Sequence, residues 1–276
     1  MNHMNNHLII DCFPYNGESI VEDRLKRMAH MVDLIYVTES WTSFSGKRKD
    51  QLHFHQNKEI FSPYMHKIRF LTIDEFPPMP DDWAERKRQL NPWMVDLNSW
   101  WREAYQRNYA TAHIGRDCVN CRYIVIVADV DEIVAPHILR SLSDRFDESY
   151  KLIGTAPIFL EMDFYYYSWN WIKPYKWYNA FMVTDAGIHS NDKLTLNDMR
   201  IETKKEGFLT KAGWHLSYFM TVDELRRKIE HFSHKEFDRP EFKSRDWIER
   251  CIREGLDLFG RANENLVAVK ERIEDR

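Results

Sequence analysis

One apolar run constrains the fold of this chain more than any other feature. Residues 123–128 are Tyr, Ile, Val, Ile, Val and Ala, and the run ends at the acidic sequence Asp129-Val130-Asp131. A run of this composition predicts a strand buried on both faces, which requires helices above and below it. We therefore expect an α/β fold with acidic side chains at the end of a central strand.

Three shorter apolar runs precede this strand and alternate with helical patterns. Strands are expected at residues 8–13, 34–38 and 68–73, and helices at residues 18–30 and 93–113. This order predicts a mostly parallel central sheet flanked by helices.

Acidic residues end each of the predicted strands, at Asp11, Glu39, Asp74 and Asp129. The carboxyl ends of parallel strands lie at one edge of the sheet, where ligands bind. The functional site is therefore expected at this edge.

Asp129 and Asp131 have the spacing of a divalent-metal site. Two carboxylates at a strand tip suit Mg²⁺ or Mn²⁺, which keep positions open for substrate phosphate oxygens. Such a cation neutralises a leaving diphosphate. The alternative is that both acids are solvated and stabilise the amino terminus of a helix beginning near Pro136.

The composition excludes several classes of protein. The chain has only 9 glycines in 276 residues, and none of them forms the Gly-x-Gly of a dinucleotide site or a P-loop. Lys and Arg number 39 against 43 Asp and Glu, which argues against a nucleic-acid-binding protein. Cys118 and Cys121 have the spacing of half a zinc site, but no second pair completes it, so reduced thiols are the preferred interpretation.

Targeting signals are not evident in the sequence. Residues 1–7 lack the basic region and cleavage site of a secretory signal, and the apolar run at residues 8–10 is far shorter than the ~20 residues that cross a bilayer. Four cysteines are too few for a disulfide framework in a chain of this length. We therefore expect a cytoplasmic protein without a transmembrane segment, and the oligomeric state stays open.

The second half of the chain has a different pattern. Strands are expected around residues 158–164, 177–183 and 214–219, and a capping box from Thr221 to Glu224 begins a helix. This half is expected to supply the walls of a site whose floor is the first half.

Short motifs occur in a fixed order between residues 8 and 238. They are Asp11-Cys12-Phe13-Pro14-Tyr15-Asn16, Glu22 with Arg24-Leu25, Val32-Asp33 with Glu39, Ser45-Gly46-Lys47, Lys67-Ile68, Gln106-Arg107-Asn108, Asp129-Val130-Asp131-Glu132-Ile133 and Gly213-Trp214-His215-Leu216-Ser217-Tyr218. This ordered set resembles glycosyltransferase family 17, which is typified by the β-1,4-mannosyl-glycoprotein N-acetylglucosaminyltransferase.

The resemblance implies a GT-A fold, which is Rossmann-like, and an N-acetylglucosaminyltransferase-like activity that inverts the anomeric carbon. It also implies a UDP-sugar donor and Mn²⁺ or Mg²⁺ at the Asp-x-Asp motif. The chain would then be a single GT-A domain over residues 1–276. In that domain residues 8–135 bind the nucleotide sugar, and residues 136–276 bind a saccharide or glycoconjugate acceptor and form the carboxyl-terminal helices.

Two features depart from the animal members of the family. Gly17 stands between Asn16 and Glu18, where those enzymes have Asn-Glu, and their amino-terminal membrane anchor is not seen. The resemblance is therefore to a branch outside the Golgi, and the glycan acceptor of the Golgi branch is not implied.

The resemblance assigns roles around the acidic motif. Asp131 is the main metal ligand, and Asp129 reaches the donor ribose or the metal through water. His215 is a third metal ligand or a diphosphate contact, or alternatively a core histidine. Glu132 supports the site or caps a helix. Asp11 contacts the donor or hydrogen-bonds the turn after its strand.

Two further residues are expected to contact the donor. Glu39 lies where GT-A enzymes contact the nucleotide base, although a helix cap or an ion pair with Lys47 or Arg48 is equally compatible with the sequence. Arg107 is a diphosphate contact, or it forms an intrahelical ion pair with Glu103, four residues earlier.

An inverting transfer needs a general base for the acceptor hydroxyl. The candidates are Glu161 and Asp163, which share one face of a predicted strand because side chains alternate along it. Asp163 is slightly preferred. His231 and His234 are interpreted as solvated surface histidines.

The aromatic tract at residues 164–178 suggests stacking on sugars, although a hydrophobic core is the alternative. Two other functions remain open. The first is a haloacid-dehalogenase-like phosphohydrolase. Asp129-x-Asp131 imitates the nucleophile motif of these enzymes, although Ile133 departs from that motif. The second is a non-catalytic carbohydrate-binding protein that uses the aromatic tract.

Overall fold

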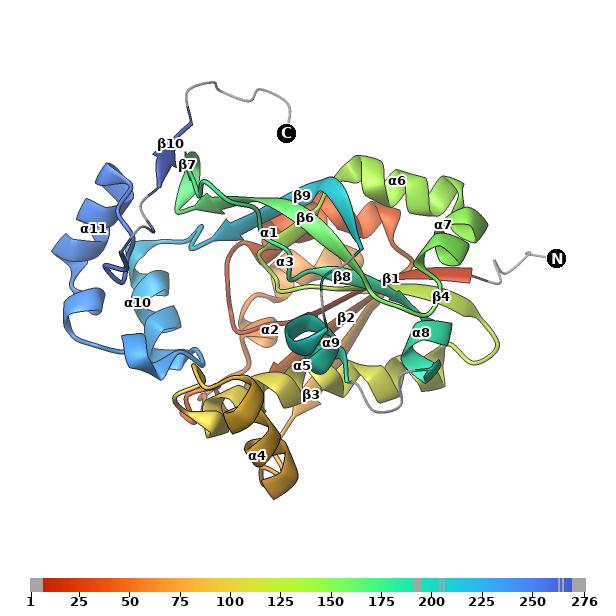
Figure 1. Ribbon diagram of the computed structural model, residues 1–276, viewed down its shortest axis with the longest axis horizontal. Coiled ribbons are helices and arrows are strands. Elements are labelled where there is room, and N and C mark those ends of the chain that lie inside the picture. Colours follow the sequence, from red (N-terminus) through yellow and green to blue (C-terminus); the bar gives the residue numbers. More distant parts are fainter. Residues whose placement is uncertain are drawn as a thin grey trace.

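The computed structural model of the chain describes residues 7–190, 195–203, 205, 207–262, 264 and 266–269. Residues 1–6, which make up most of the segment considered as a leader, lie outside the described residues. Within the described part, ten strands form one mixed sheet with helices on both faces (Figure 1). The predicted α/β class, with a central sheet between helices, is confirmed.

Four parallel strands form the first half of the sheet, where the apolar runs predict them. They are β1 (His7–Pro14), β2 (Leu34–Ser40), β3 (Ile68–Ile73) and β4 (Arg122–Val127). Their order across the sheet is β3, β2, β1, β4, so β1 has β2 on one side and β4 on the other. Such a reversal leaves a crevice at the carboxyl ends of β1 and β4, where ligands bind in open α/β sheets.

Helices cover both faces of these strands (Figure 1). On one face lie α1 (Val21–Met28), α6 (Pro136–Asp144) and α7 (Phe146–Ile153), and on the other lie α5 (Leu97–Asp117) and α9 (Leu196–Glu202). Each layer has its own apolar core against the sheet.

Local signals set where these helices begin. Val21, Leu25 and Met28 of α1 are buried because apolar residues recur every three or four positions. Helix α5 begins later than the predicted residue 93, because Asp96 caps it by accepting hydrogen bonds from two backbone N–H groups of the first turn.

The second half of the sheet pairs mainly antiparallel. Its strands are β5 (Glu132–Val134), β6 (Ile158–Tyr166), β7 (Ser168–Ile172), β8 (Phe181–Thr184), β9 (Phe208–Ser217) and β10 (Val267–Ala268). Strand β8 joins the two halves by pairing with β4 and β6, and β9 runs parallel to β6. The parallel arrangement expected from the first half thus holds for β1 to β4, and hairpin-like pairings dominate beyond them.

The last helices close one end of the sheet (Figure 1). Helix α10 (Val222–His231) begins at the predicted capping box of Thr221 and Glu224, which is confirmed. Together with α11 (Arg245–Glu254), it packs on the ends of β6 and β9 through a third apolar cluster. The remaining helices are α2 (His53–Gln56), α3 (Lys58–Phe61), α4 (Asp81–Leu90) and α8 (Asp185–Ser190).

Two further expectations, about membrane-spanning helices and about the cysteines, can be compared with this fold. Among the helices of the described part, none has the length and apolar character needed to cross a membrane. Cys118 is buried and Cys121 is half-buried, both as free thiols, and the described residues contain no group of three His, Cys, Asp or Glu side chains that could hold a metal.

Candidate active site

The carboxyl ends of β1 and β4 bring two distant segments of the chain together. The strands pair in parallel, and the backbone N–H of Ala128 donates to the carbonyl oxygen of Cys12 at 3.2 Å. The turn at residues 16–18 follows β1, and the acidic loop at residues 129–131 follows β4. Both segments therefore border the same crevice.

Two cavities occupy this crevice. The first, which we call the Lys49 pocket, has a volume of about 310 Å³ and lies beyond the ends of β1 and β2. The second, the Asp131 pocket, has a volume of about 450 Å³ and contains the acidic loop. The two pockets share wall residues, which are Asn16, Glu18, Phe44, Lys228 and Phe232.

Asp11 supports the acidic loop from behind. Strand β1 continues three residues past Asp11, so this residue lies inside the strand rather than at its end. Its buried carboxylate accepts a hydrogen bond from Arg24 Nε at 2.9 Å. Arg24 Nη1 in turn donates to the backbone carbonyls of Asp129 at 3.0 Å and of Glu132 at 2.7 Å. The geometry thus places Asp11 behind the loop, in contact with Arg24.

Asp129 is held by two arginines. Arg107 Nη1 donates to one carboxylate oxygen and Arg200 Nη2 donates to the other. Burial raises the pKa of Asp129, but the two guanidinium groups outweigh it and hold this pKa well below its usual range. Arg107 also donates to Glu103 at 2.9 Å, so the intrahelical pair is present, and the diphosphate contact expected for Arg107 stays a prediction.

Glu132 is a fully buried support for the same loop. Its carboxylate accepts two hydrogen bonds from Arg200, at 2.9 and 2.7 Å, and one from the backbone N–H of Asp129 at 2.7 Å. The indole N–H of Trp177 donates to it as well. Glu132 therefore fixes the loop and does not face the cavity, in agreement with the supporting role expected for it.

Asp129 and Asp131 both line the Asp131 pocket, and Asp131 differs in that no arginine binds its carboxylate among the described residues. Lys228 Nζ lies 3.1 Å from its Oδ2, and His215 Nε2 lies 3.6 Å from its Oδ1. Burial lowers the pKa of His215 and outweighs the opposing charge of Asp131, which favours the neutral imidazole. His215 Nδ1 is buried and has no hydrogen-bond partner among the described residues.

Strand pairing sets the position of His215. It lies opposite Glu132 in the β5–β9 pair and beside Phe164 in the β6–β9 pair. Its ring stacks on Phe164 with 4.5 Å between ring centres. Two residues earlier, Gly213 has a φ of +152°, and a Cβ there would lie 2.0 Å from the carbonyl oxygen of Ile133. The close approach of β5 and β9 therefore requires glycine at this position.

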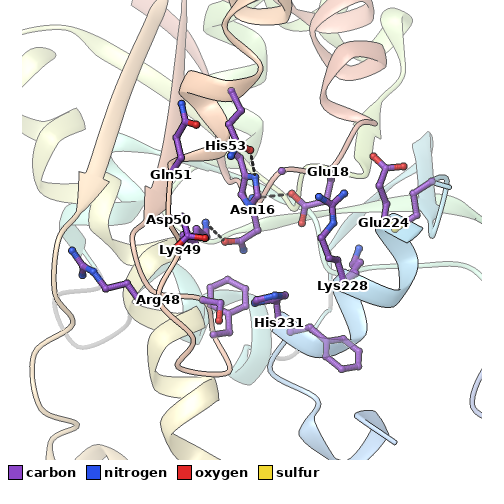
Figure 2. Close-up of a pocket in the computed structure, with 17 residues that line it drawn as sticks. Asn16, Glu18, Arg48, Lys49, Asp50, Gln51, His53, Glu224, Lys228 and His231 are labelled. Atoms are coloured by element: carbon purple, nitrogen blue, oxygen red, sulfur yellow. Dashed lines mark hydrogen bonds between the residues drawn. The ribbon is translucent and has the colours of Figure 1, made fainter. Parts of the chain in front are cut away.

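Glu39 organises the Lys49 pocket. It is fully buried, pairs with Lys49 Nζ at 2.8 Å and accepts backbone hydrogen bonds from His53 and Phe54 at the start of α2. The cap and ion-pair interpretation of Glu39 thus describes its contacts, with Lys49 in place of Lys47 or Arg48. Figure 2 shows Lys49 and its partner Asn16 facing the side chains that reach in from α10.

Glu161 and Asp163 lie outside both pockets. Phe164 stacks on His215 and lines the Asp131 pocket, so Asp163, the next residue along β6, points to the opposite face of the strand. There it pairs with Lys176 and borders a different cavity beside Trp214. Glu161 accepts a hydrogen bond from the Tyr178 hydroxyl at 2.9 Å. The structure does not bring the two predicted bases to the acidic motif.

The Asp131 pocket has an aromatic wall. Phe164, Tyr166, Tyr175 and Trp177 of the aromatic tract line it, whereas Tyr165 faces the cavity of Asp163. This division follows the alternation of side chains along β6.

Two histidines differ from the interpretation as solvated surface groups. Both are half-buried, and they border the two cavities: His231 lines the Lys49 pocket and His234 lines the Asp131 pocket. His234 Nδ1 lies 2.7 Å from a carboxylate oxygen of Glu236. A hydrogen on Nδ1, donated to this carboxylate, leaves Nε2 as the basic nitrogen.

Comparison with known proteins identifies the family. The sequence model of glycosyltransferase family 17 matches residues 3–271, nearly the whole chain. The chain belongs to glycosyltransferase family 17. No curated protein matches the chain. As a family 17 protein the chain is a glycosyltransferase, with a sugar donor and an acceptor as its partners, and its helix-flanked sheet is compatible with the Rossmann-like glycosyltransferase fold.

The family 17 resemblance also implies a divalent cation, and part of the predicted ligand set fits one. Two atoms that are each about 2.1 Å from one metal lie at most about 4.2 Å apart, so the 3.6 Å between Asp131 Oδ1 and His215 Nε2 allows both to bind it. Asp129 fits less well as a direct ligand, because each of its oxygens already accepts a hydrogen bond from an arginine. A cation with two protein ligands would take its other ligands from water or donor phosphates.

Three charged residues of the family 17 site were not singled out as functional by the sequence. Arg24 is part of one of the ordered motifs, but the sequence does not mark it as a functional residue. Arg200 and Lys228 lie outside those motifs. Arg200 lies in a short helix without a chemical signature, and Lys228 follows Arg226 and Arg227 in a basic run of α10. Only the fold shows that Lys228 borders both pockets, whereas Arg227 lines the Lys49 pocket alone and Arg226 lines neither.

Proposed function

We propose that this glycosyltransferase is a metal-dependent, inverting enzyme that moves a sugar from a UDP-sugar to a saccharide or glycoconjugate acceptor. GlcNAc is the transferred sugar that we propose to test first. The observation that supports this proposal is the pair of connected pockets at the switch point of the sheet, one lined by polar groups and the other by an acid, a histidine and aromatic rings.

We assign one part of the substrates to each pocket. The nucleoside binds in the Lys49 pocket, at the ends of β1 and β2, where Asn16, Lys49 and His53 offer polar partners. The transferred sugar and the acceptor bind in the Asp131 pocket, because sugar rings stack their C–H faces on aromatic side chains such as Phe164 and Trp177.

Asp131 and His215 would hold the divalent cation in this proposal. When bound, the cation neutralises the charge of the leaving diphosphate. Asp129 contributes indirectly, since Arg107 and Arg200 fix its position and thereby the shape of the loop that carries Asp131.

Inversion requires a base on the acceptor side of the anomeric carbon. The acceptor oxygen forms a bond to this carbon while the bond to the diphosphate oxygen breaks, and the base takes the acceptor proton. We propose His234 for this role, because it lines the aromatic pocket and Glu236 orients its ring. The nucleoside diphosphate leaves with the electron pair of the broken bond.

The phosphohydrolase alternative is less compatible with the contacts of Asp129. That chemistry needs the first aspartate as a nucleophile, and both of its carboxylate oxygens are bound by guanidinium groups. A carbohydrate-binding protein without catalysis remains as an outcome of the experiment below.

The proposal is tested by thermal unfolding with a panel of nucleotide sugars, with and without Mn²⁺. For the wild-type protein with Mn²⁺ we expect a UDP-sugar to raise the melting temperature by roughly 5 °C at about 100 times its Kd, and by less without the metal. Asp131→Asn should lose this metal-dependent shift and sugar transfer. Asp147→Asn, at an exposed surface pair, should keep both.

Stabilisation by glycans alone, with no response to any nucleotide sugar, would instead favour the carbohydrate-binding alternative. A full response in Asp131→Asn would exclude Asp131 as the metal ligand.

A further inference from the structure

The junction between the two pockets carries one positive charge. Of the wall residues that the Lys49 and Asp131 pockets share, Lys228 is the cationic one. A ligand that fills both pockets must therefore pass beside its ammonium group. We propose that Lys228 binds the diphosphate of the donor; this inference rests on the proposed function, in which the nucleoside and the sugar occupy different pockets.

Lys228 is held at the junction by contacts on several sides. It lies on α10 between the buried residues Leu225 and Ile229, and its side chain is 24% exposed. Its Nζ is 3.1 Å from Asp131 Oδ2 and 5.3 Å from the centre of the Tyr218 ring. Figure 2 shows Lys228 entering the pocket from α10, on the side of Glu18.

The ammonium group has hydrogen-bond donors to spare. An ammonium has three N–H donors, and the hydrogen bond to Asp131 uses one. The others can be donated to phosphate oxygens, which lysine binds as a point charge.

Three other cations that line these pockets are already bound to neighbouring side chains, and Arg48, Arg227 and Arg261 each line only one of the two pockets. Arg107 and Arg200 bind the acids of the 129–132 loop, and Lys49 binds Glu39 and Asn16. Among the residues that the structure describes, glycine amides do not form a phosphate loop at this edge, because Gly17 is the one glycine that lines either pocket. Lys228 thus supplies the charge that a glycine-rich loop supplies in other nucleotide sites.

The test compares ligands that differ in their phosphates. Calorimetric affinities for uridine, UMP and UDP are measured in EDTA and again in Mn²⁺, on the wild type, Lys228→Gln and Lys228→Arg. We expect Lys228→Gln to weaken UDP about 10- to 100-fold, in both buffers, while the affinity for uridine changes less than about 3-fold. Lys228→Arg, which keeps the charge, should stay within about 10-fold of the wild type for UDP.

A control variant and a second background make the outcome decisive. Arg226→Gln removes a positive charge from the outer face of α10 and should leave the affinity for UDP unchanged. If Lys228→Gln is unstable because Asp131 loses its partner, Lys228→Gln in an Asp131→Asn background is compared with Asp131→Asn alone.

Two results would overturn the inference in different ways. If the wild type binds UDP and Lys228→Gln binds it equally well, or loses UDP and uridine to the same extent, Lys228 is not the diphosphate site. If the wild type binds neither UDP nor uridine, the proposed nucleotide-sugar donor fails as well.

Discussion

Asp129 and Asp131 are two residues apart and chemically identical, yet the fold gives them different roles. Asp129 is bound through both oxygens by Arg107 and Arg200, and Asp131 faces the cavity beside Lys228 and His215. The sequence predicted an acidic site at this strand end. It could not separate the two acids, because their partners come from helices and strands more than 20 positions away.

At the scale of single residues, the identity of the general base can be tested by two substitutions. His234→Gln should lower the rate of transfer about 100-fold or more with little change in donor affinity, because it removes the proposed base from the aromatic pocket. Asp163→Asn should keep most of the activity, because Asp163 faces the other side of β6. Initial rates and donor dissociation constants are the measurements. The reverse pattern would return the role of base to Asp163.

At the scale of elements, the β5–β9 pairing aligns the acidic loop with His215, and Gly213 permits it. Gly213→Ala places a Cβ against the carbonyl of Ile133, so we expect a loss of at least about 1–3 kcal/mol of unfolding free energy and a fall in transfer. Gly115→Ala is the matched control. It lies in α5 with open space around it, and alanine there should be neutral or stabilise by about 0.5–1 kcal/mol. Urea unfolding measures both, and equal effects would contradict the requirement for glycine.

Helix α9, which carries Arg200, is anchored by a buried ion pair that makes its stability depend on pH. Asp198 Oδ1 lies 2.9 Å from Lys87 Nζ of α4. Burial raises the pKa of Asp198, but the hydrogen bond from Lys87 and its charge outweigh this effect and lower the pKa. The pair therefore stabilises the fold above the unfolded-state pKa of about 3.9, and this contribution is lost as the pH falls through the folded pKa.

Asp198→Asn should accordingly cost about 1–3 kcal/mol at pH 7, because the buried Lys87 loses one of its two carboxylate partners and keeps Glu202. The difference from the wild type should shrink below pH ~4. Unfolding free energies from urea titrations at pH 7, 5 and 3 provide the comparison, and a constant difference across this range would argue against the ion pair as its source.

For the whole molecule, the sequence predicted the first half of the fold better than the second. Continuous apolar runs marked β1 to β4, since a strand buried on both faces leaves a local signal. The face of β6 that meets the site had no such signal. Alternation placed Glu161 and Asp163 on one side together, but the pairing of Phe164 with His215 decides which side that is. A shift of one residue in this register would exchange the two faces.

The shared wall of the two pockets also has a thermodynamic consequence. Helix α10 contributes Lys228 to both cavities, and Phe232, the next residue after the helix, also borders both. A ligand that orders this helix from one cavity changes the wall of the other, and the resulting coupling free energy is reciprocal. Donor and acceptor would then bind cooperatively, because the entropic cost of ordering α10 falls on the substrate that binds first. The coupling free energy is the same whichever substrate binds first.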